Sequence, residues 1–337
     1  MRRFAAFLVL CAALAPSTVT AQPFDVIGTK AAGMGGAFVA VADDASAVYW
    51  NPGGLAQGAY FSLVLDGGIR HSVPEVGVRG TEHSSYLVAV SMPALGLSYY
   101  RLESAFARPD TLLAPADGVA RILEGATPIR VDTLTTHHAG VTVVHSVLPS
   151  LSVGSTMKLV HGVVSSRLHE LATAEEALDA DLPQGRGTTK FDIDTGVMLT
   201  AGRLKSGLTV RNLLEPDFTT PEGRTLTLDR QVRAGVSYLV FSSLLAAADF
   251  DLVEIEDAFG DRRDAAIGLD LQLTRRAALR GGLRFNTAGD DPDLNDRRAY
   301  TTGGSFAVTG SVHIDGVVTF GGDQSGRGWG IAARLVY

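Results

Sequence analysis

The sequence predicts an all-β protein: a transmembrane antiparallel β-barrel of about 14 strands with an N-terminal hatch inside its lumen. Three observations lead to this prediction. Apolar and polar residues alternate over segments of roughly ten residues, which is long for a strand of a soluble protein. Long and short links alternate between these segments. The N-terminal part, in contrast, is rich in glycine and other small residues and shows no alternation.

The composition agrees with a β-rich chain. The 337 residues include 38 glycines, well above the usual content of about 7%, and glycine favours tight turns over helices. No segment reaches the roughly 18 consecutive apolar residues of a transmembrane helix. The formal net charge is −7. Because binding to nucleic acid requires clustered basic residues, we expect no nucleic-acid partner.

The N-terminus has the features of a secretory signal peptide. Two arginines precede an apolar run over residues 4–15, and small residues offer a cleavage site before Gln22. The run is shorter than the roughly 20 residues that a membrane anchor needs. We therefore expect residues 1–21 to be a signal peptide.

Alternation identifies the strands. In the last segment, Trp329, Ile331 and Leu335 share one face, whereas Arg334 lies on the other. Such a strand meets two different environments on its two faces. The segments with this pattern are 58–70, 82–92, 94–104, 130–146, 150–164, 189–201, 205–214, 228–240, 243–254, 262–273, 276–287, 298–309, 311–320 and 328–337.

The links between these segments predict the orientation. Tight links at Pro93, 148–150 and 202–204 alternate with long ones such as 104–128 and 170–187. Periplasmic turns are short and outer loops are long in bacterial outer-membrane barrels. We therefore expect a barrel in the bacterial outer membrane with both termini in the periplasm. Aromatic residues near the strand ends are typical of the two membrane interfaces: Tyr60, Tyr238, Phe250, Phe285, Tyr300, Phe320, Trp329 and Tyr337.

The strand faces opposite the apolar ones carry charges of both signs. These are Lys158, Asp192, Asp194, Arg211, Arg233, Asp249, Asp251, Asp270, Arg280, Arg284, Asp315 and Arg334. If the apolar faces meet lipid, these side chains line the lumen. We expect Asp249, Asp251, Asp270, Arg280 and Arg284, on neighbouring strands, to form a ladder of opposite charges. An ion pathway is one interpretation. We favour mutual pairing in a filled lumen, because buried charges need partners.

The hatch is predicted over residues 22–57, ahead of the barrel at 58–337. Its central stretch, 28–55, reads GTKAAGMGGAFVAVADDASAVYWNPGGL. The residues that we expect to carry its function are Gly33, Gly35, Gly36, Asp43, Asp44, Asn51 and Pro52. The glycines permit backbone conformations closed to other residues. Either aspartate can cap a short helical turn, and the Asn-Pro pair can end it.

The expected contacts of the hatch are with the charged wall. We predict that Asp43, Asp44 and Asn51 contact the barrel, and that Arg280, Arg284 or Arg334 supplies the partners. Opposite charges inside a lumen attract one another more strongly than they do in water.

Signals for catalysis or metal binding are weak. His137 and His138 are adjacent on one strand, so their side chains point to opposite faces and cannot both bind one metal. The stretch after Asp44 lacks the alternating oxygen ligands of a calcium loop, and GMGG lacks the context of a dinucleotide site. Cys11, the only cysteine, lies in the predicted signal peptide. We expect no enzyme activity, no catalytic residue, no cofactor and no metal site.

The run AAGMGGAFVAVADDASAVYWNPGGLA resembles the N-terminal signature of the FadL-like outer-membrane barrels, in the branch of the PorV- and PorQ-type proteins. Weaker similarities follow in GLTVRNLLEPDF at 207–218 and ALRGGLRF at 278–285. The resemblance implies a fourteen-stranded barrel with an N-terminal hatch. The family usually has Ala after the Asn-Pro pair. This chain has Gly53, and we expect that difference to loosen the end of the hatch.

The resemblance implies two main roles. FadL-type members pass hydrophobic molecules, typically fatty acids or aromatics, through a gated barrel, whereas PorV-type members serve protein export and surface attachment through the type IX system. Our leading hypothesis is gated passive uptake of hydrophobic small molecules. The alternative is a secretion component with secretion-system proteins as partners, and a third possibility is a structural envelope barrel. Outer-membrane lipid surrounds the barrel in each case.

Overall fold

The computed structural model describes residues 18–19, 26–72, 80–109, 128–169, 173–179, 185–219, 225–257, 260–288, 298–321 and 326–337. The predicted signal peptide lies outside the described residues except for the short strand β1 (Thr18–Val19). Most of the predicted long links 104–128 and 170–187 also lie outside them. Within the described ranges, no helix is long and apolar enough to cross a membrane.

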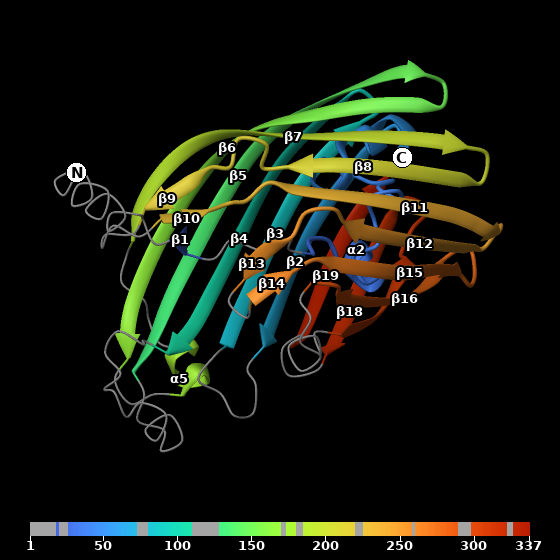
Figure 1. Ribbon diagram of the computed structural model, residues 1–337. Helices are drawn as coiled ribbons and strands as arrows, with labels where there is room; N and C mark the ends of the chain where they lie inside the picture. The colour runs from blue at the N-terminus through green and yellow to red at the C-terminus, as the bar shows by residue number, and fades with distance from the viewer. Residues whose placement is uncertain are drawn as a thin grey trace.

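Fourteen antiparallel strands form a closed barrel, which confirms the predicted fold class. Barrel strands that follow one another along the chain are also neighbours in space, and β19 pairs with β2 to close the barrel (Figure 1). In this pairing Trp329 lies opposite Ile69. The strands are β2 (Ser62–Ser72), β3 (Gly80–Met92), β4 (Leu95–Pro109), β5 (Ile129–Leu148), β6 (Leu151–His169), β7 (Arg186–Ala201), β8 (Leu204–Arg211), β11 (Gln231–Phe241), β12 (Leu244–Asp251), β15 (Asp264–Gln272), β16 (Ala277–Asn286), β17 (Ala299–Ala307), β18 (Val312–Gly321) and β19 (Arg327–Val336).

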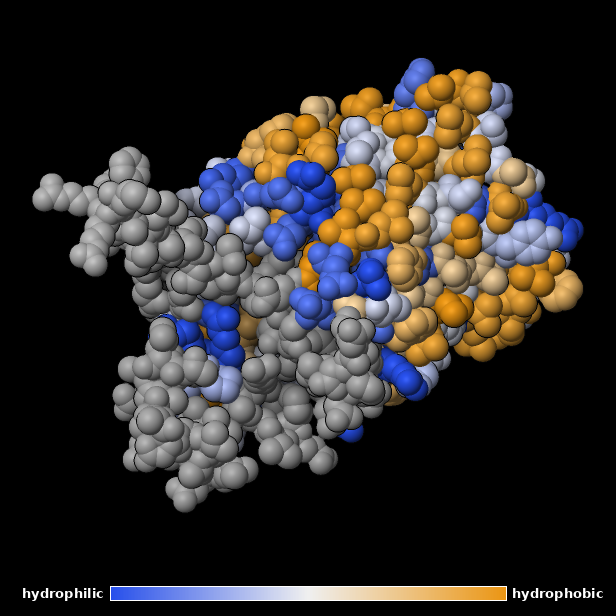
Figure 2. All heavy atoms as spheres, in the orientation of Figure 1, coloured by the Kyte–Doolittle hydropathy of each residue, from blue (hydrophilic) through white to orange (hydrophobic). Residues whose placement is uncertain are grey.

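The outer face of the barrel is an apolar belt. Side chains such as Ile331 and Leu269 are 56% and 46% exposed, and apolar side chains gather over the strands in the view of Figure 2. A continuous apolar surface of this kind is unfavourable in water and fits the hydrocarbon of a bilayer. Exposed aromatic residues lie toward both ends of the strands: Tyr99, Phe191, Phe250, Tyr300, Phe320 and Trp329 at one end, and Tyr60, Tyr238, Phe241, Phe306 and Tyr337 at the other.

The two ends of the barrel differ in their links. At one end, here called the turn side, six links of two to four residues join neighbouring strands. The other end, the loop side, carries the long links. There β5 and β6 run to 20 and 19 residues, beyond the predicted 130–146 and 150–164, so these strands project past the apolar belt.

Small elements cover both faces of this projection. Helix α5 (Ala174–Asp179) packs Ala174 and Ala177 against outward positions of β4 and β5. On the inner face, Phe218 and Leu226 pack against Leu134. They belong to β9 (Asp217–Thr219) and β10 (Thr225–Thr227), which pair with each other; β10 also pairs with β1. A separate hairpin consists of β13 (Ile255–Asp257) and β14 (Gly260–Arg262).

The segment 26–57 lies inside the barrel, where the sequence predicts a hatch (Figure 1). It contains α2 (Thr29–Gly33), α3 (Ala47–Trp50) and the 3₁₀ helix η1 (Pro52–Gln57). The segment and the inward side chains of the wall together form the main hydrophobic core. The boundaries 22–57 and 58–337 remain predictions, since residues 22–25 are outside the described residues.

The start of α3 differs from the prediction that Asp43 or Asp44 caps it. The N-cap is Ser46, and its side chain makes no capping hydrogen bond. Asp44 instead accepts hydrogen bonds from the backbone N–H and the hydroxyl of Ser46, at 2.9 and 2.5 Å. The aspartate therefore orders the turn before the helix, because its carboxylate lies too early in the chain to reach the first helical N–H groups.

Candidate functional site

The interface between the segment 26–57, here called the hatch, and the wall is the candidate functional site, because this segment lies inside the barrel. On one side, α3 and η1 pack against β5 to β8. Trp50 is fully buried and donates its indole N–H to the carbonyl of Ile27 at 2.8 Å. Tyr49 is also fully buried, and the Arg211 guanidinium lies 3.5 Å from the centre of its ring. Cations over aromatic faces are attracted strongly when both are desolvated.

Hydrogen bonds between backbone and side-chain groups also join the hatch to the wall at β7 and β12. Asp249 accepts from the N–H groups of Phe38 and Val39 at 2.8 and 2.9 Å. Asn51 donates to the carbonyl oxygens of Val39 and Val197 at 2.9 and 3.0 Å. The predicted contact of Asn51 with the wall is therefore present, and it goes to a backbone carbonyl and not to an arginine.

Close approach of glycines brings the hatch against the wall. Gly35 and Gly36 have φ of 68° and 88°, in the region that favours glycine. A Cβ on Gly35 would lie 2.9 Å from the Leu283 nitrogen, and one on Gly282 would lie 2.1 Å from the Gly35 nitrogen. The hatch motif glycines thus permit a backbone-to-backbone contact that side chains would prevent.

Gly53 corrects one expectation from the sequence. A Cβ at this position would lie 2.9 Å from the Gly196 oxygen and 3.1 Å from the Met198 nitrogen. In addition, Ser152 donates its hydroxyl to the Gly53 carbonyl at 2.7 Å. Glycine in place of alanine therefore tightens this end of the hatch. The prediction that it loosens the end was wrong, because sequence alone does not reveal how closely the wall approaches.

A cluster of three charged side chains near Tyr49, namely Lys158, Asp192 and Asp194, is fully buried. The Lys158 ammonium lies 2.7 Å from both oxygens of Asp194 and 3.1 Å from an oxygen of Asp192. It also donates to the Asn212 side chain at 3.1 Å. These lumen charges satisfy one another, as predicted for a filled lumen.

On the other side of the hatch, α2 faces β2 and β16 to β19. Asp44 lies 3.6 Å from Arg334, as the sequence suggested. Asp43 does not contact the wall arginines: it pairs with Lys30, inside the hatch, at 2.6 Å. That part of the prediction was wrong. The α2 helix places Lys30 beside Asp43. Burial raises the pKa of Asp43, but the neighbouring ammonium lowers it, and the net pKa is below its ordinary value.

The predicted charge ladder is present in part. Arg280 pairs with Asp270 at 3.0 Å across neighbouring strands, as predicted, whereas Asp251 pairs with Arg233, which was not a member of the ladder, at 2.5 Å. The other pairings differ.

Two members of the predicted ladder have other partners. Asp249 accepts a hydrogen bond from the hatch backbone, and Arg284 lies 3.7 Å from Asp264. Arg280 and Arg334 also share Asp315, at 2.9 and 2.5 Å. Neither Arg280 nor Arg284 forms an ion pair with the described part of the hatch, contrary to the prediction. Wall aspartates pair with these arginines instead: Asp270 lies directly opposite Arg280 in the strand register, and Asp264 lies diagonally from Arg284.

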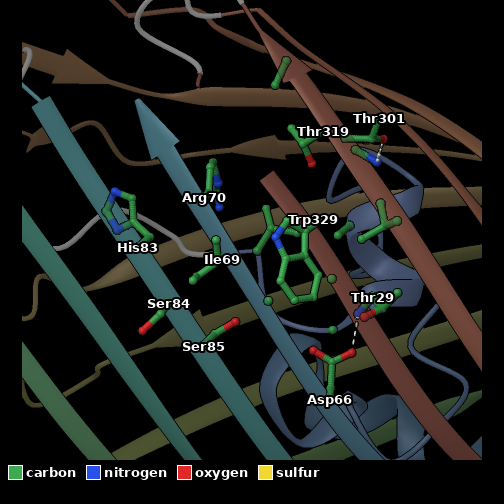
Figure 3. Close-up of a pocket in the computed structure, with 18 of the residues that line it drawn as sticks. Thr29, Asp66, Ile69, Arg70, His83, Ser84, Ser85, Thr301, Thr319 and Trp329 are labelled. Atoms are coloured by element: carbon green, nitrogen blue, oxygen red, sulfur yellow. Dashed lines mark hydrogen bonds between the residues drawn. The ribbon is translucent and has the colours of Figure 1, made fainter. Parts of the chain in front are cut away.

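A small hollow of about 60 Å³ lies between α2 and the wall, toward the loop side. We call it the loop-side hollow. Its apolar lining includes Val26, Ile69, Val317 and Trp329, and its polar lining includes Arg70. Figure 3 shows Arg70, His83, Trp329 and the hydrogen bond of 2.5 Å from the Thr29 N–H to Asp66 that fastens the start of α2.

The wall beside the loop-side hollow has small side chains. Gly68 of β2 faces Gly330 of β19, and both line the hollow. Ile69 and Trp329, the residues just beside them in the chain, occupy outward positions and also border it; Trp329 is 59% exposed. Side chains from both faces of the wall therefore meet at this hollow.

A second hollow, of about 350 Å³, lies toward the turn side. We call it the turn-side hollow. Charged side chains dominate its lining, among them Lys30, Asp43, Arg276 and Arg334. Thr29 and Ala32 of α2 line the loop-side hollow, whereas Lys30 of α2 lines the turn-side hollow.

Sequence reasoning did not single out Lys30, Asp66, Arg70 and Asp264 as site residues. Asp66 and Arg70 have the inward parity of β2, and Asp264 has that of β15, so extending the alternation to the strand ends would have found them. Lys30 lies on the short α2, where no period marks its partner.

Comparison with known proteins adds the following. A family model described as "F plasmid transfer operon, TraF, protein" matches residues 111–251, less than half of the chain. No curated protein matches the sequence.

Several solved structures share the architecture. The "CymD monoaromatic hydrocarbon channel" has a TM-score of 0.65 at 13% identity, covering 94% of this chain and 99% of that one. The barrel has the FadL-type fold. The toluene transporter TodX of P. putida has a TM-score of 0.58 at 11% identity, covering 91% and 97%. A Pseudomonas aeruginosa FadL homologue has 0.57 at 12%, covering 96% and 100%.

Proposed function

We propose that the protein is an outer-membrane channel for gated passive uptake of hydrophobic small molecules of the fatty-acid or aromatic type. The loop-side hollow carries this proposal, since apolar side chains such as Ile69, Val317 and Trp329 line it together with polar and charged ones between the hatch and the wall. The FadL-type fold supports it, because two of the compared structures are described as a hydrocarbon channel and a toluene transporter. The proposed role is transport and not catalysis.

The gate in this proposal is the hatch. Its glycines lie against the wall backbone, and the lumen charges are paired, so the closed state offers no open aqueous pore. A ligand in the loop-side hollow lies against α2 and beside the small residues Gly68 and Gly330. Movement of α2 then opens a path toward the periplasm or the wall. Both termini are proposed to lie in the periplasm.

Filling the loop-side hollow tests the uptake route. A Cβ on Gly68 would have the Trp329 oxygen at 3.3 Å, and the further methyl groups of Gly68→Val would occupy the hollow. We expect initial uptake of toluene or oleate to fall at least about fivefold, because one well-placed obstruction of this size costs about 1 kcal/mol or more. Gly316→Val is the matched control, since nothing lies within 4 Å of a Cβ there. Equal uptake by both variants contradicts the proposed route.

Removing the hatch tests the gate. In vesicles, a variant that lacks residues 28–55 should leak small solutes faster than the intact chain. Unchanged leakage would show that the hatch is not the closing element.

The rival role is a PorV-type component of protein secretion. None of the structures compared above is of that type. Affinity purification from detergent extracts separates the two roles. Stable secretion-system proteins without bound hydrophobic molecules would favour the rival, whereas co-purified hydrophobic molecules identified by mass spectrometry favour uptake. A structural barrel would yield neither.

A further inference from the structure

The turn-side hollow is unlike the loop-side hollow in its chemistry. Its cations are Lys30, Arg275, Arg276, Arg280 and Arg334, and its carboxylates are Asp43, Asp44 and Asp270. A neutral hydrocarbon gains nothing from such a lining, since every charged group keeps its preference for water or for an opposite charge. The hollow is large enough to hold a small organic molecule.

The deeper cations already have partners. Arg280 pairs with Asp270 and Asp315, and Lys30 pairs with Asp43. Ion pairs of this kind reduce the attraction for a further anion.

Arg275 and Arg276 differ from these deeper cations. They occupy the tight link between β15 and β16, are exposed, and line the mouth of the hollow. Neither side chain forms a hydrogen bond or an ion pair with the described part of the chain. The six tight links of the turn side contain Arg203, Arg275 and Arg276 and no aspartate or glutamate. Two unpaired guanidinium groups at one mouth favour an anion with more than one carboxylate, because each guanidinium can bind a carboxylate in a bidentate fashion.

The hatch carboxylates lie just inside this mouth. The side chain of Asp43 is 40% exposed although it pairs with Lys30, and Asp44 lies 3.6 Å from Arg334. An anion that enters the hollow meets Lys30 and Arg334 at the positions that these two carboxylates now occupy. Binding of the anion therefore competes with the ion pairs that hold the turn-side end of the hatch.

We propose that the turn-side hollow is a binding site for a small organic anion with two or more carboxylates, held first by Arg275 and Arg276. The bound anion weakens the Lys30–Asp43 and Arg334–Asp44 pairs. It thereby loosens the hatch from the side opposite the loop-side hollow. The site thus couples an anion on one side of the membrane to the gate.

Citrate is a suitable probe for binding to the full mature chain in detergent. We expect saturable binding by calorimetry at constant ionic strength. The double variant Arg275→Gln, Arg276→Gln should bind at least about tenfold more weakly, which corresponds to about 1.4 kcal/mol. Arg203→Gln, on the same side but outside the hollow, is the control. Absence of saturable binding, or equal weakening by Arg203→Gln, overturns the site.

Coupling to the hatch has a separate readout. Hydrogen exchange of residues 28–45 should accelerate with citrate in the intact chain, and not in the double variant. Sodium chloride at the same ionic strength should have a smaller effect. Saturable citrate binding without any change in exchange, or an equal effect of sodium chloride, overturns the coupling. Neither result bears on the proposed uptake, which the Gly68→Val comparison tests independently.

Discussion

The two sides of the hatch are held in different ways. The side of α3 and η1 is anchored by fully buried groups: Trp50 and Tyr49, with Arg211 over the Tyr49 ring. The side of α2 lies between two hollows, of about 60 and 350 Å³. One of its ion pairs, Lys30–Asp43, includes a carboxylate that is partly exposed.

This difference indicates which part of the hatch moves. Displacing α3 would expose fully buried aromatic rings and buried charges, each at a cost of several kcal/mol. Displacing α2 separates Lys30 from Asp43, whose carboxylate is partly exposed, and α2 already borders two hollows. We infer that α3 and η1 form the fixed part of the hatch and that α2 forms the movable part. The following predictions test that division.

Lys158→Met should have the largest effect. It would leave Asp192 and Asp194 buried without their ammonium partner, so we expect a loss of about 3–5 kcal/mol in the free energy of unfolding. Urea unfolding in lipid vesicles measures it. The control is Lys190→Met, which removes an exposed pair with Asp217 and should cost less than about 1 kcal/mol. Similar costs for both variants would contradict the anchored side.

Trp50→Ala should be nearly as damaging. The ring is fully buried between Phe38 and Tyr49, and removing it leaves a cavity worth about 3–5 kcal/mol. Protease protection of the hatch and urea unfolding both report the change. Trp329→Ala, on the outer face, should alter unfolding far less; a comparable loss would mean that the hatch core contributes little.

Gly35→Ala should have an intermediate effect, at the boundary between the two sides. A Cβ would lie 2.9 Å from the Leu283 nitrogen, and φ is 68°. Gly202 has a similar φ of 62° with nothing within 4 Å, so Gly202→Ala isolates the backbone strain. We expect Gly35→Ala to cost about 2 kcal/mol more than Gly202→Ala. Equal costs would show that the glycine contact does not hold α2.

Acidification should have the smallest effect and should act on the α2 side. The pKa of Asp43 is below its ordinary value of 3.8 because of Lys30, although burial opposes the shift. A carboxyl group whose pKa is lower in the folded state than in the unfolded state stabilises the folded state at pH values above the unfolded-state pKa. This stabilisation is lost as the pH falls through the folded-state pKa. The contribution of the Lys30–Asp43 pair to hatch order should therefore be fully present above about pH 4 and decline below it.

A fluorescent label on the hatch can follow this titration. The mature chain is expected to contain no cysteine, so a single cysteine introduced at Ala32 would carry the label. Lys30→Met removes the partner of Asp43 and should abolish the acid-dependent step. A step that persists in Lys30→Met would assign it to another carboxyl group.

The wall could be predicted from the sequence almost completely. Each strand meets lipid on one face and the lumen on the other, so a period of two residues marks both its presence and its inward side chains. The inward charges Lys158, Asp192 and Arg233 were found in this way, and the structure buries all three. The hatch motif was also identified, because Gly35, Gly36 and Asn51 stand in a stretch without alternation.

The pairing of the charges and the shape of the gate required the tertiary structure. Asp43 pairs with Lys30 because α2 folds back on the following turn, and Arg284 pairs with Asp264 because of strand register. Gly53 tightens the hatch only because the β6 and β7 backbones approach it. The alternation of apolar and polar residues indicates which face of a strand a residue occupies. Distances across a lumen and the hollows left between packed segments depend on how the closed barrel and its hatch fit together.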